Sequence, residues 1–523
     1  ADKNYIKIKD QTSRVNMQQS GLGVSIGDVA HARDIFLDKT YRQETGRKEF
    51  YSAQYEVATY VEDLMQELNG EQFKESVNNL WQAVQELSTK PAISTNQNLV
   101  LQKAELLVTR SQSIYSDLKS YQSNINQQIK DDVDRVNEIG NRVYELNLKI
   151  QKVEAGGVET AMTLRDERDS LLDELGQYGR MDVTEDATGF CFVDFEGVRF
   201  IDDHRCNNIG LNSAKGTGFY TPYWPQQSDA ANEKYVSVFR LEDAISTEMN
   251  TDIGGIKSKL LARGDRYGVA SDLTTNEAYD KVSRSTVMEV EAQIDTLFSR
   301  IVKAMNDVYC PNVESKDAIT SVDGTVYPAG TKILDADNCA RGVDGKLPPR
   351  ELFTRVGVDR YTEVTGMDGK TYYIYNEEDP NNTSTMYSIG SVSINSDLKR
   401  QITLMPAYTA NGAVDYDFGH RLANAWNVKD MVLSPDDQKP CTFEEYYDKV
   451  VSQLGIIGNT YQSATETMEG TVSSVDNKRQ QVIGVSSDEE LTYMIKFQSA
   501  YNAASRFMNV ISEMTELIVT GLK

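Results

Sequence analysis

The stretch "INQQIKDDVDRVNEIGNRVYELNLKI", residues 125–150, decides the fold class because its apolar side chains recur every three or four residues. Side chains at that spacing share one face of an α-helix. The helical pattern extends from about Leu101 to Lys152, and at about 1.5 Å per residue a helix of that length is about 75 Å long. The sequence therefore predicts a rod whose stripe consists of Ile125, Ile129, Asp132, Val136, Ile139, Val143, Leu146 and Ile150.

Shorter helical patterns lie on both sides of this rod. Residues 1–27 alternate in polarity and predict short extended segments, and helical periodicity begins at Asp28, the expected N-cap. After the rod, "TLRDERDSLLDELGQY" (163–178) predicts a further helix. Because these stripes have partners within one helical block, we expect them to pack inside the chain. The preceding stripes are Val57, Val61, Leu64 and Leu68, and then Phe73, Val77, Leu80, Trp81, Val84 and Leu87.

Two later regions change from helical spacing to alternation and turns. "FCFVDFEGVRFID" (190–202) predicts two strands around Glu196-Gly197. Helical spacing returns in "STVMEVEAQIDTLFSRIVKAMNDVY" (285–309), and again from "TFEEYYDKVVSQLG" (442–455) to the end. Between them, the dipeptides Asp323-Gly324 and Asp368-Gly369 mark the expected tips of hairpins.

Together these patterns predict an elongated α+β multidomain protein. Separated helical blocks that each lack a full core can complete one another, so we expect a stalk, a bundle of long helices built from discontinuous segments, with β-rich inserted domains and a C-terminal coiled-coil-like helix. The predicted stalk segments are 1–180, 246–310 and 441–485, the β-rich insertions are 181–245 and 311–440, and the terminal assembly helix is 486–523.

The composition excludes several classes of partner. With 54 Lys and Arg against 79 Asp and Glu, the net charge is −25, which disfavours binding to nucleic acid or to an anionic membrane. No apolar run reaches the roughly 20 residues of a membrane-spanning helix, and the polar start "ADKNYIKIKD" lacks the apolar core of a cleavable signal peptide. We therefore predict no nucleic-acid and no membrane partner.

The residue types that carry chemistry form no recognisable site. His31, His204 and His420 are far apart, and the five cysteines are widely spaced without a CxxC pair. "LDADNCARGVDGK" (334–346) begins like a calcium loop, but Lys346 stands where the bidentate Glu is needed. Gly369-Lys370-Thr371 leads into a strand pattern, so it predicts a hairpin turn rather than a phosphate-binding loop. We predict no metal, no cofactor and no enzymatic activity.

The C-terminal stretch "EELTYMIKFQSAYNAASRFMNVISEMTELIVTGLK" (489–523) carries another long stripe, in which one Thr, Thr515, is the only polar member. An apolar helical stripe is buried in a stable protein, yet no equally long unpaired helix remains in this chain to cover it. The stripe therefore predicts an interface with another helix. The expected interface residues are Met494, Phe497, Gln498, Tyr501, Ala504, Met508, Ile511 and Ile518.

Three stretches resemble the bacterial flagellar hook-associated protein 1 family. They are "SGLGVSIGDVAHARDIFLDKTYRQET" (20–45), the helix at 163–178 with its Arg168-Asp169 pair and Leu171-Leu172 step, and "SSDEELTYMIKFQSAYNAASRFMNVISEMTELI" (486–518). The last pattern also occurs in other axial proteins of the flagellum, so it identifies the class better than the member. Its matching positions are Glu490, Gln498, Ala500, Tyr501 and Ala503.

The resemblance implies a structural role at the hook-filament junction outside the cell, after export through the flagellar type III apparatus without a cleaved signal peptide. The implied partners are the hook protein, the second hook-associated junction protein, further copies of this chain in a ring, and an export chaperone on the C-terminal helix. The family's N-terminal helix has no counterpart here, so we expect truncation. Residues 489–523 would then lack their intrachain mate and would be disordered or held by a neighbouring molecule.

Three alternatives remain open. The chain could be a flagellar axial protein of another type, or a junction protein with an adhesin-like or enzymatic activity in its β-rich insertions. It could also be an unrelated coiled-coil signalling or adaptor protein, although the three matching stretches argue against this.

Overall fold

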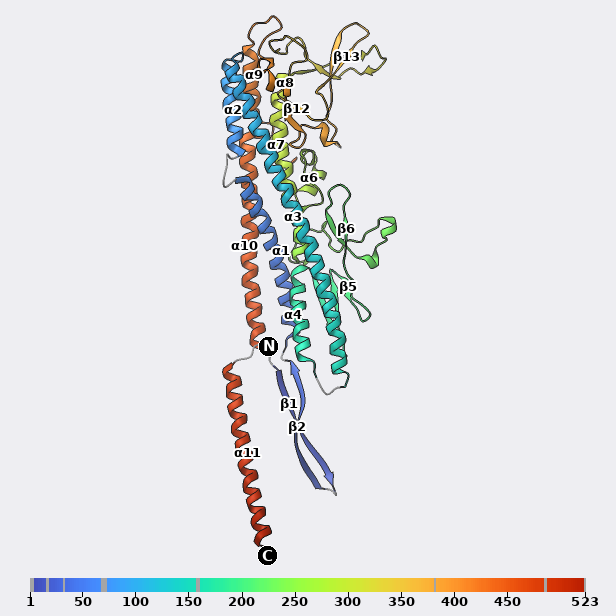
Figure 1. Ribbon diagram of the computed structural model, residues 1–523, viewed down its shortest axis with the longest axis vertical. Helices are drawn as coiled ribbons and strands as arrows, with labels where there is room; N and C mark the ends of the chain where they lie inside the picture. The colour runs from blue at the N-terminus through green and yellow to red at the C-terminus, as the bar shows by residue number, and fades with distance from the viewer. Residues whose placement is uncertain are drawn as a thin grey trace. The chain divides into compact units, whose positions relative to one another are not determined.

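The computed structural model describes residues 4–15, 18–31, 33–66, 73–156, 160–380, 382–483 and 487–521, and the chain forms two compact units (Figure 1). The first unit comprises Ala1–Lys48, Arg135–Asn208 and Glu466–Lys523, and the second comprises Glu49–Asp134 and Ile209–Thr465. Long helices alternate with small antiparallel sheets along the chain, which confirms the predicted α+β class.

The first unit is built around the last third of a long helix. The buried face of this helix, α3, covers a three-stranded antiparallel sheet, and residues from Val136 to Ile150 form the unit's core with Phe195 and Phe200. The elements of this unit are a hairpin of β1 (Asn4–Val15) and β2 (Gln18–His31), the start of α1 (Ile35–Gln66), the last third of α3 (Ser94–Glu154), α4 (Met162–Tyr178), the sheet of β3 (Met181–Glu185), β4 (Cys191–Phe195) and β5 (Val198–Ile201), the end of α10 (Phe443–Ile483), and α11 (Ser487–Gly521).

The second unit surrounds α7 (Thr286–Tyr309), whose side chains are buried on most sides. Its helices are the rest of α1, α3 and α10, with α2 (Phe73–Thr89), α5 (Gly255–Arg263), α6 (Asn276–Val282), α8 (Ser396–Arg400) and α9 (Tyr416–Trp426). Its sheets are β6 (Gly210–Ser213) with β7 (Tyr220–Tyr223), β9 (Ile319–Thr320) with β10 (Val326–Tyr327), β12 (Phe353–Arg355) with β15 (Val392–Ile394), and a four-stranded sheet in the order β13 (Tyr361–Thr365), β14 (Thr371–Tyr375), β11 (Lys332–Leu334), β8 (Asn312–Glu314).

Most of the predicted elements are present. The rod is α3, and its stripe is buried at every apolar position. The turn at Glu196-Gly197 joins β4 to β5 with positive φ values of 50° and 78°, and Gly324 and Gly369 lie at hairpin tips with φ near 88° and 77°. Glycine suits these positions because it has no Cβ to oppose a left-handed backbone. In the stripe from Val57, Leu68 lies outside the described residues.

Asp132, the charge inside the α3 stripe, has a partner that the sequence did not indicate. Its carboxylate lies 2.7 Å from the ammonium group of Lys259 on α5, and both side chains are largely buried. Burial raises the pKa of Asp132, and the nearby Lys259 opposes that shift. An ion pair therefore replaces an apolar contact at this point of the seam.

One sequence prediction was wrong and another was incomplete. Helix α1 begins at Ile35 rather than at Asp28, which lies in β2; its N-cap is Asp34, whose carboxylate accepts hydrogen bonds from the backbone N–H groups of Phe36 and Leu37. The region 311–440, predicted as strands and turns, also contains α8 and α9. Helix α9 packs against α2 and α7, and Trp426 stacks on Trp81 with ring centroids 5.5 Å apart.

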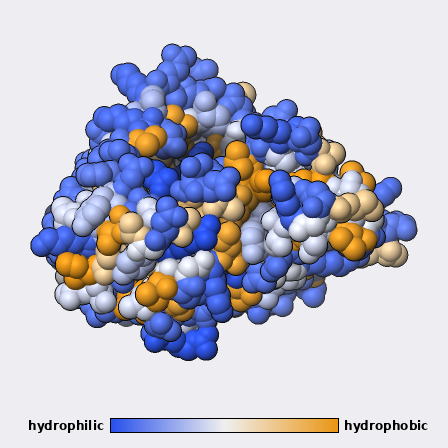
Figure 2. Space-filling view, turned by 90° about the horizontal axis from the view of Figure 1, so that it is seen from above, coloured by the Kyte–Doolittle hydropathy of each residue, from blue (hydrophilic) through white to orange (hydrophobic). Residues whose placement is uncertain are grey.

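The surface fits the composition. The face seen in Figure 2 is mostly hydrophilic, with apolar residues in small patches between polar ones. Among the described residues, no helix combines the length and the hydropathy needed to cross a membrane.

Close packing between α3 and the sheet predicts the effect of adding a single methyl group. A Cβ at Gly140 would lie 2.4 Å from the Phe200 ring and 2.7 Å from the Cys206 sulfur. We expect Gly140→Ala to lower the free energy of unfolding by about 1–3 kcal/mol through overpacking. Gly470→Ala is the matched control, since nothing lies within 4 Å of its Cβ, and it should raise helix stability by up to about 1 kcal/mol. Thermal unfolding of both variants checks this, and equal midpoints would contradict it.

Buried acids on α7 predict a pH dependence. Glu291 is fully buried; one carboxylate oxygen accepts a hydrogen bond from the Gly268 N–H at 2.6 Å, and the other has no hydrogen-bond partner among the described residues. Burial raises the pKa of Glu291 to about 8, with Lys119 opposing the shift and Asp295 and Asp272 adding to it. The protonated acid is therefore the form that suits this site.

Because the folded-state pKa of Glu291 lies above its unfolded value, the stability that protonation contributes is complete below about pH 4.5 and is lost as pH rises through about 8. Glu291→Gln cannot lose a proton. We expect the stability of this variant relative to wild type to increase between pH 5 and pH 9, by about 1.4 kcal/mol for each pH unit within the window at most. Urea unfolding across that pH range measures it, and a difference that is constant with pH would refute the assignment.

Candidate assembly surface

Helix α11 carries the predicted interface residues, and every one of them is exposed. The described residues from Glu490 to Gly521 are all exposed, including Phe497 at 62%, Tyr501 at 75% and Met508 at 65%. The seam predicted from the sequence, which we call the first seam, consists of Met494, Phe497, Tyr501, Ala504, Met508, Ile511, Thr515 and Ile518.

Thr515, the one polar member of the first seam, is satisfied within its own helix. Its hydroxyl donates to the backbone carbonyl of Ile511 at 2.7 Å. Thr520 makes the same bond to Glu516 at 2.6 Å. Since the hydroxyl of Thr515 already has an acceptor, burying this residue against another helix leaves no donor unpaired.

A second seam, which the sequence analysis missed, lies beside the first. It follows the same alternation of three and four residues, shifted by one position towards the N-terminus, and consists of Ala500, Ala503, Phe507, Val510, Met514, Leu517 and Gly521. These residues are also exposed, with Phe507 at 66% and Leu517 at 72%. Repeating the test for periodicity one residue earlier would have found this seam.

The two seams together cover four of the seven heptad positions, and the remaining positions are mostly polar. A two-stranded coiled coil uses only two apolar positions per heptad, so an apolar surface of this width suits contact with more than one helix. The polar side includes Ser499, Asn502, Ser505, Arg506, Asn509, Ser512, Glu513 and Glu516, and Gln498, a predicted interface residue, borders the first seam.

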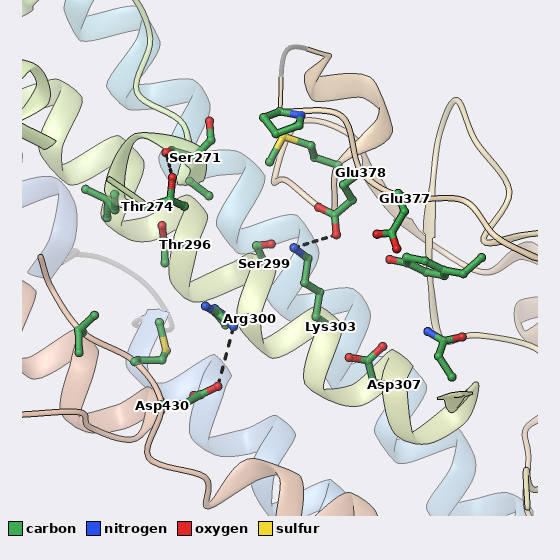
Figure 3. A pocket seen from close by; sticks show the side chains of 18 of the residues that line it. Ser271, Thr274, Thr296, Ser299, Arg300, Lys303, Asp307, Glu377, Glu378 and Asp430 are labelled. Atoms are coloured by element: carbon green, nitrogen blue, oxygen red, sulfur yellow. Dashed lines mark hydrogen bonds and ion pairs between the residues drawn. The ribbon is translucent and has the colours of Figure 1, made fainter. Parts of the chain in front are cut away.

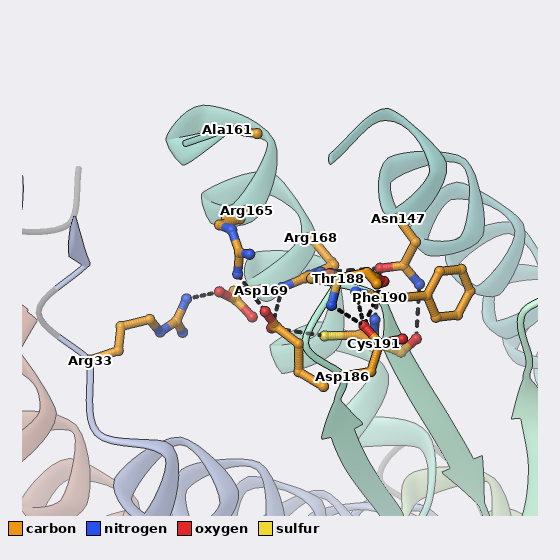
Figure 4. A network of polar contacts seen from close by, with 12 residues as sticks. Arg33, Asn147, Ala161, Arg165, Arg168, Asp169, Asp186, Thr188, Phe190 and Cys191 are labelled. Atoms are coloured by element: carbon orange, nitrogen blue, oxygen red, sulfur yellow. Dashed lines mark hydrogen bonds and ion pairs between the residues drawn. The ribbon is translucent and has the colours of Figure 1, made fainter. Parts of the chain in front are cut away.

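A buried polar network secures α4 in the first unit (Figure 4). Arg168, which is 1% exposed, donates to the Asn147 side chain on α3, to the Gly189 carbonyl at 2.7 Å and to the Glu185 carboxylate at 2.8 Å. Asn147 in turn donates to the Cys191 carbonyl at 2.8 Å. Both Nη atoms of Arg168 are paired, while its Nε has no hydrogen-bond partner among the described residues. A charge buried this deeply needs such partners, so the network has a structural function.

A groove in the second unit runs along α7 and has a volume of about 1020 Å³ (Figure 3). The cations in its wall point at carboxylates: Lys303 lies 2.8 Å from Glu378, and Arg300 lies 3.9 Å from Asp430. Lys332 is similarly placed 3.1 Å from Glu377. Asp307, the remaining charged residue in the described lining, lies 2.6 Å from Arg360, so each charged side chain described in the groove has a partner of opposite charge.

The histidines and acidic residues that were considered as metal ligands or catalytic groups do not come together in the structure. His204 is exposed in the loop that follows β5, His420 is exposed on α9, and His31 lies in β2. Asp335 accepts hydrogen bonds from its neighbour Asn338 and so shapes a local turn. Among the described residues, no group of three or more His, Cys, Asp or Glu side chains could hold a metal ion.

The five cysteines are free thiols, and four of them are buried. Burial raises the pKa of Cys191 and of Cys206 to about 12. A thiol that stays protonated near neutral pH is a poor nucleophile.

Comparisons with known proteins agree with one another. Residues 58–314 match the family model described as the flagellar hook-associated protein FlgK helical domain. Flagellar hook-associated protein 1 of Bacillus subtilis (strain 168) is 23% identical over 529 residues, covering 99% of this chain and 90% of the relative. The proteins of that name from Salmonella typhimurium and Escherichia coli (strain K12) are each 20% identical, covering 95% of this chain and 90% of the relative.

A solved structure shares the fold. The flagellar hook junction protein FlgK from Burkholderia pseudomallei superposes with a TM-score of 0.52, covering 86% of this chain and 100% of that chain at 12% identity.

The exposure of α11 predicts fast amide exchange. In the isolated chain, peptides within 489–523 should exchange hydrogen for deuterium much faster than peptides covering 136–150 of α3, whose apolar side chains are fully buried. Hydrogen exchange read by mass spectrometry makes the comparison within one sample. Protection of α11 equal to that of α3 in a monomer would contradict this expectation, because the seams would then be covered within the chain.

Proposed function

We propose that this chain, which is similar in sequence to flagellar hook-associated protein 1, is a structural component of the bacterial flagellum that joins hook to filament. Its mechanism is mechanical rather than catalytic, because α11 provides a surface that is completed only by assembly. The observation that carries this proposal is the exposure of both apolar seams along the whole described length of α11.

Energetics favour burial of α11 against a partner. Burying a Leu-sized or Met-sized side chain contributes about 1.5–3 kcal/mol, and ordering a helix costs roughly 1–2 kcal/mol of backbone entropy per residue. A lone helix in water therefore gains little from its own apolar surface, whereas a docked one gains from each seam. We assign the assembly interface to Met494, Phe497, Gln498, Tyr501, Ala504, Met508, Ile511 and Ile518, together with the second seam.

The distribution of charge along the chain also favours α11 as the place where molecules make contact. The chain has a net charge of −25, so two copies repel each other over most of their surfaces. From Leu491 to Gly521, α11 carries two basic residues, Lys496 and Arg506, and two acidic ones, Glu513 and Glu516. A locally neutral, apolar helix is the part of this molecule that approaches another acidic copy at least electrostatic cost.

The proposed partners follow from this role. They are the flagellar hook protein, the second hook-associated junction protein, further copies of this chain in a ring, and an export chaperone that covers α11 before assembly. The protein would act at the flagellum outside the cell, exported without a cleaved signal peptide. Within the chain, the β-rich segments 181–245 and 311–440 would be insertions between parts of a helical stalk.

An added enzymatic or adhesin-like activity in the β-rich segments has no observation in its favour. The groove along α7 is lined by compensated charges, and the buried thiols are held in the protonated form. We therefore propose that the protein is not an enzyme.

Single charges placed on α11 test the assembly interface. Met508→Glu and Phe507→Glu put a carboxylate in the first and second seam, whereas Asn509→Glu adds the same charge on the polar side. We expect each seam variant to weaken assembly by more than about tenfold, which corresponds to about 1.4 kcal/mol, because an unpaired charge would be buried. Asn509→Glu should stay within about twofold of wild type.

Motility of a strain whose own copy is deleted, complemented with each variant, gives the readout, with recovery of the protein in isolated hooks as the direct measure. If the seam variants are incorporated as well as Asn509→Glu is, α11 is not the assembly surface.

A further inference from the structure

The last turns of α10 in the first unit are attached to the rest of that unit through a charged residue. In the stretch 466–482, Arg479 is the single buried residue, at 8% exposure, while the apolar side chains are only half-buried. A helix face normally docks by burying apolar side chains. The half-buried apolar residues are Met468, Val472, Val475 and Val482.

Arg479 makes three contacts with α1 and α4. Its Nε lies 2.7 Å from an oxygen of Asp38, and its Nη2 donates to Asp173 at 2.5 Å. Its guanidinium group also lies 4.7 Å from the centroid of the Tyr41 ring, which is the geometry of a cation–π contact.

The two aspartates belong to a closed ring of alternating charges. Asp173 also accepts a hydrogen bond from Arg42 Nε at 2.7 Å, and Asp38 accepts one from Arg33 Nε at 2.9 Å. Arg42 and Arg33 both pair with Asp169, and Figure 4 shows Arg33 pointing at this carboxylate. The ring runs Arg479, Asp173, Arg42, Asp169, Arg33, Asp38 and back to Arg479, and no side chain in it is more than 19% exposed.

The ring is electrically neutral, with three cations and three anions, and α10 supplies one of the six members. Opening it at Arg479 leaves two arginines against three aspartates in a poorly hydrated place. Removing one partner from a buried ion network is strongly destabilising, because the charge left behind keeps its desolvation cost. Loss of one member of the ring is therefore expected to loosen the contact between α10 and the helices α1 and α4.

We propose that this ring is an electrostatic latch and that Arg479 is a positioning residue, which docks the last turns of α10 and so fixes the point from which the chain continues to α11. When the latch opens, 466–483 detaches while the rest of α10, in the second unit, stays folded. The docking stands independently of the proposed function; its consequence for assembly through α11 rests on that function.

Hydrogen exchange of the full chain tests the latch without any assembly partner. Arg479→Gln removes the charge, and Lys478→Gln removes the neighbouring charge, which is exposed. We expect Arg479→Gln to speed exchange in 466–483 by about tenfold or more, equivalent to about 1.4 kcal/mol, with little change in 443–465. Lys478→Gln should stay within about twofold of wild type.

A double variant separates charge balance from packing. Arg479→Gln with Asp38→Asn restores a neutral set of two arginines and two aspartates, so exchange in 466–483 should be slower than in Arg479→Gln alone. Arg479→Lys, which keeps the charge but not the two-sided geometry, should lie between wild type and Arg479→Gln, and it provides the comparison if Arg479→Gln does not fold. The latch is refuted if Arg479→Gln matches Lys478→Gln, if exchange rises equally in 443–465, or if the double variant is no slower than the single one.

Discussion

Burial of one continuous stripe along α3 is the interaction on which both compact units depend. The first two thirds of the helix contribute their apolar face to the second unit and the last third contributes its face to the first, from Ile125 and Ile129 through Val136 to Ile150. Other elements take their places from this stripe: Lys259 neutralises its one charge, and the sheet of β3, β4 and β5 packs so closely on it that Gly140 has no room for a Cβ.

Helix α11 carries apolar stripes like that of α3, but no other part of the described chain covers them. Its seams are as regular as that of α3, yet the side chains of Phe497, Tyr501 and Met508 are exposed. An exposed apolar helix surface of this size is typical of a binding site for another molecule. The latch formed by Arg479 adds a second feature of the same design, because the helix that leads towards α11 is docked by exchangeable charge contacts rather than by an apolar core.

The periodicity of the sequence predicted the elements that local residue spacing determines, and it missed the elements that depend on contacts between distant segments. The rod, the hairpin tips and the first seam follow from spacing and turn residues, which the chain carries locally. The start of α1 was misplaced because Asp28 and Asp34 are equally good N-caps in sequence, and only the pairing of β2 with β1 excludes Asp28. Helix α9 was missed because its short pattern lies among turn signals, and what it packs against, α2 and α7, comes from distant segments.

The candidate site shows the same division. The residues of the first seam were all predicted from the sequence. The second seam was overlooked because the first stripe was sufficient to predict a helix, and the neighbouring positions were not tested for a second stripe. The charge ring could not be predicted at all, since its members come from three separate segments and pair only in the folded chain.

The seams of α11 are exposed in the free chain, and we propose that they are buried in the assembly. Hydroxyl-radical footprinting of methionine oxidation tests this most directly, because Met494 and Met508 lie on the first seam, Met514 lies on the second, and Met367, 70% exposed at the tip of a hairpin, serves as reference. The account predicts that all four oxidise readily in the monomer and that the three α11 methionines become protected relative to Met367 on assembly. Protection of those three already in the monomer, or equal oxidation before and after assembly, would contradict it.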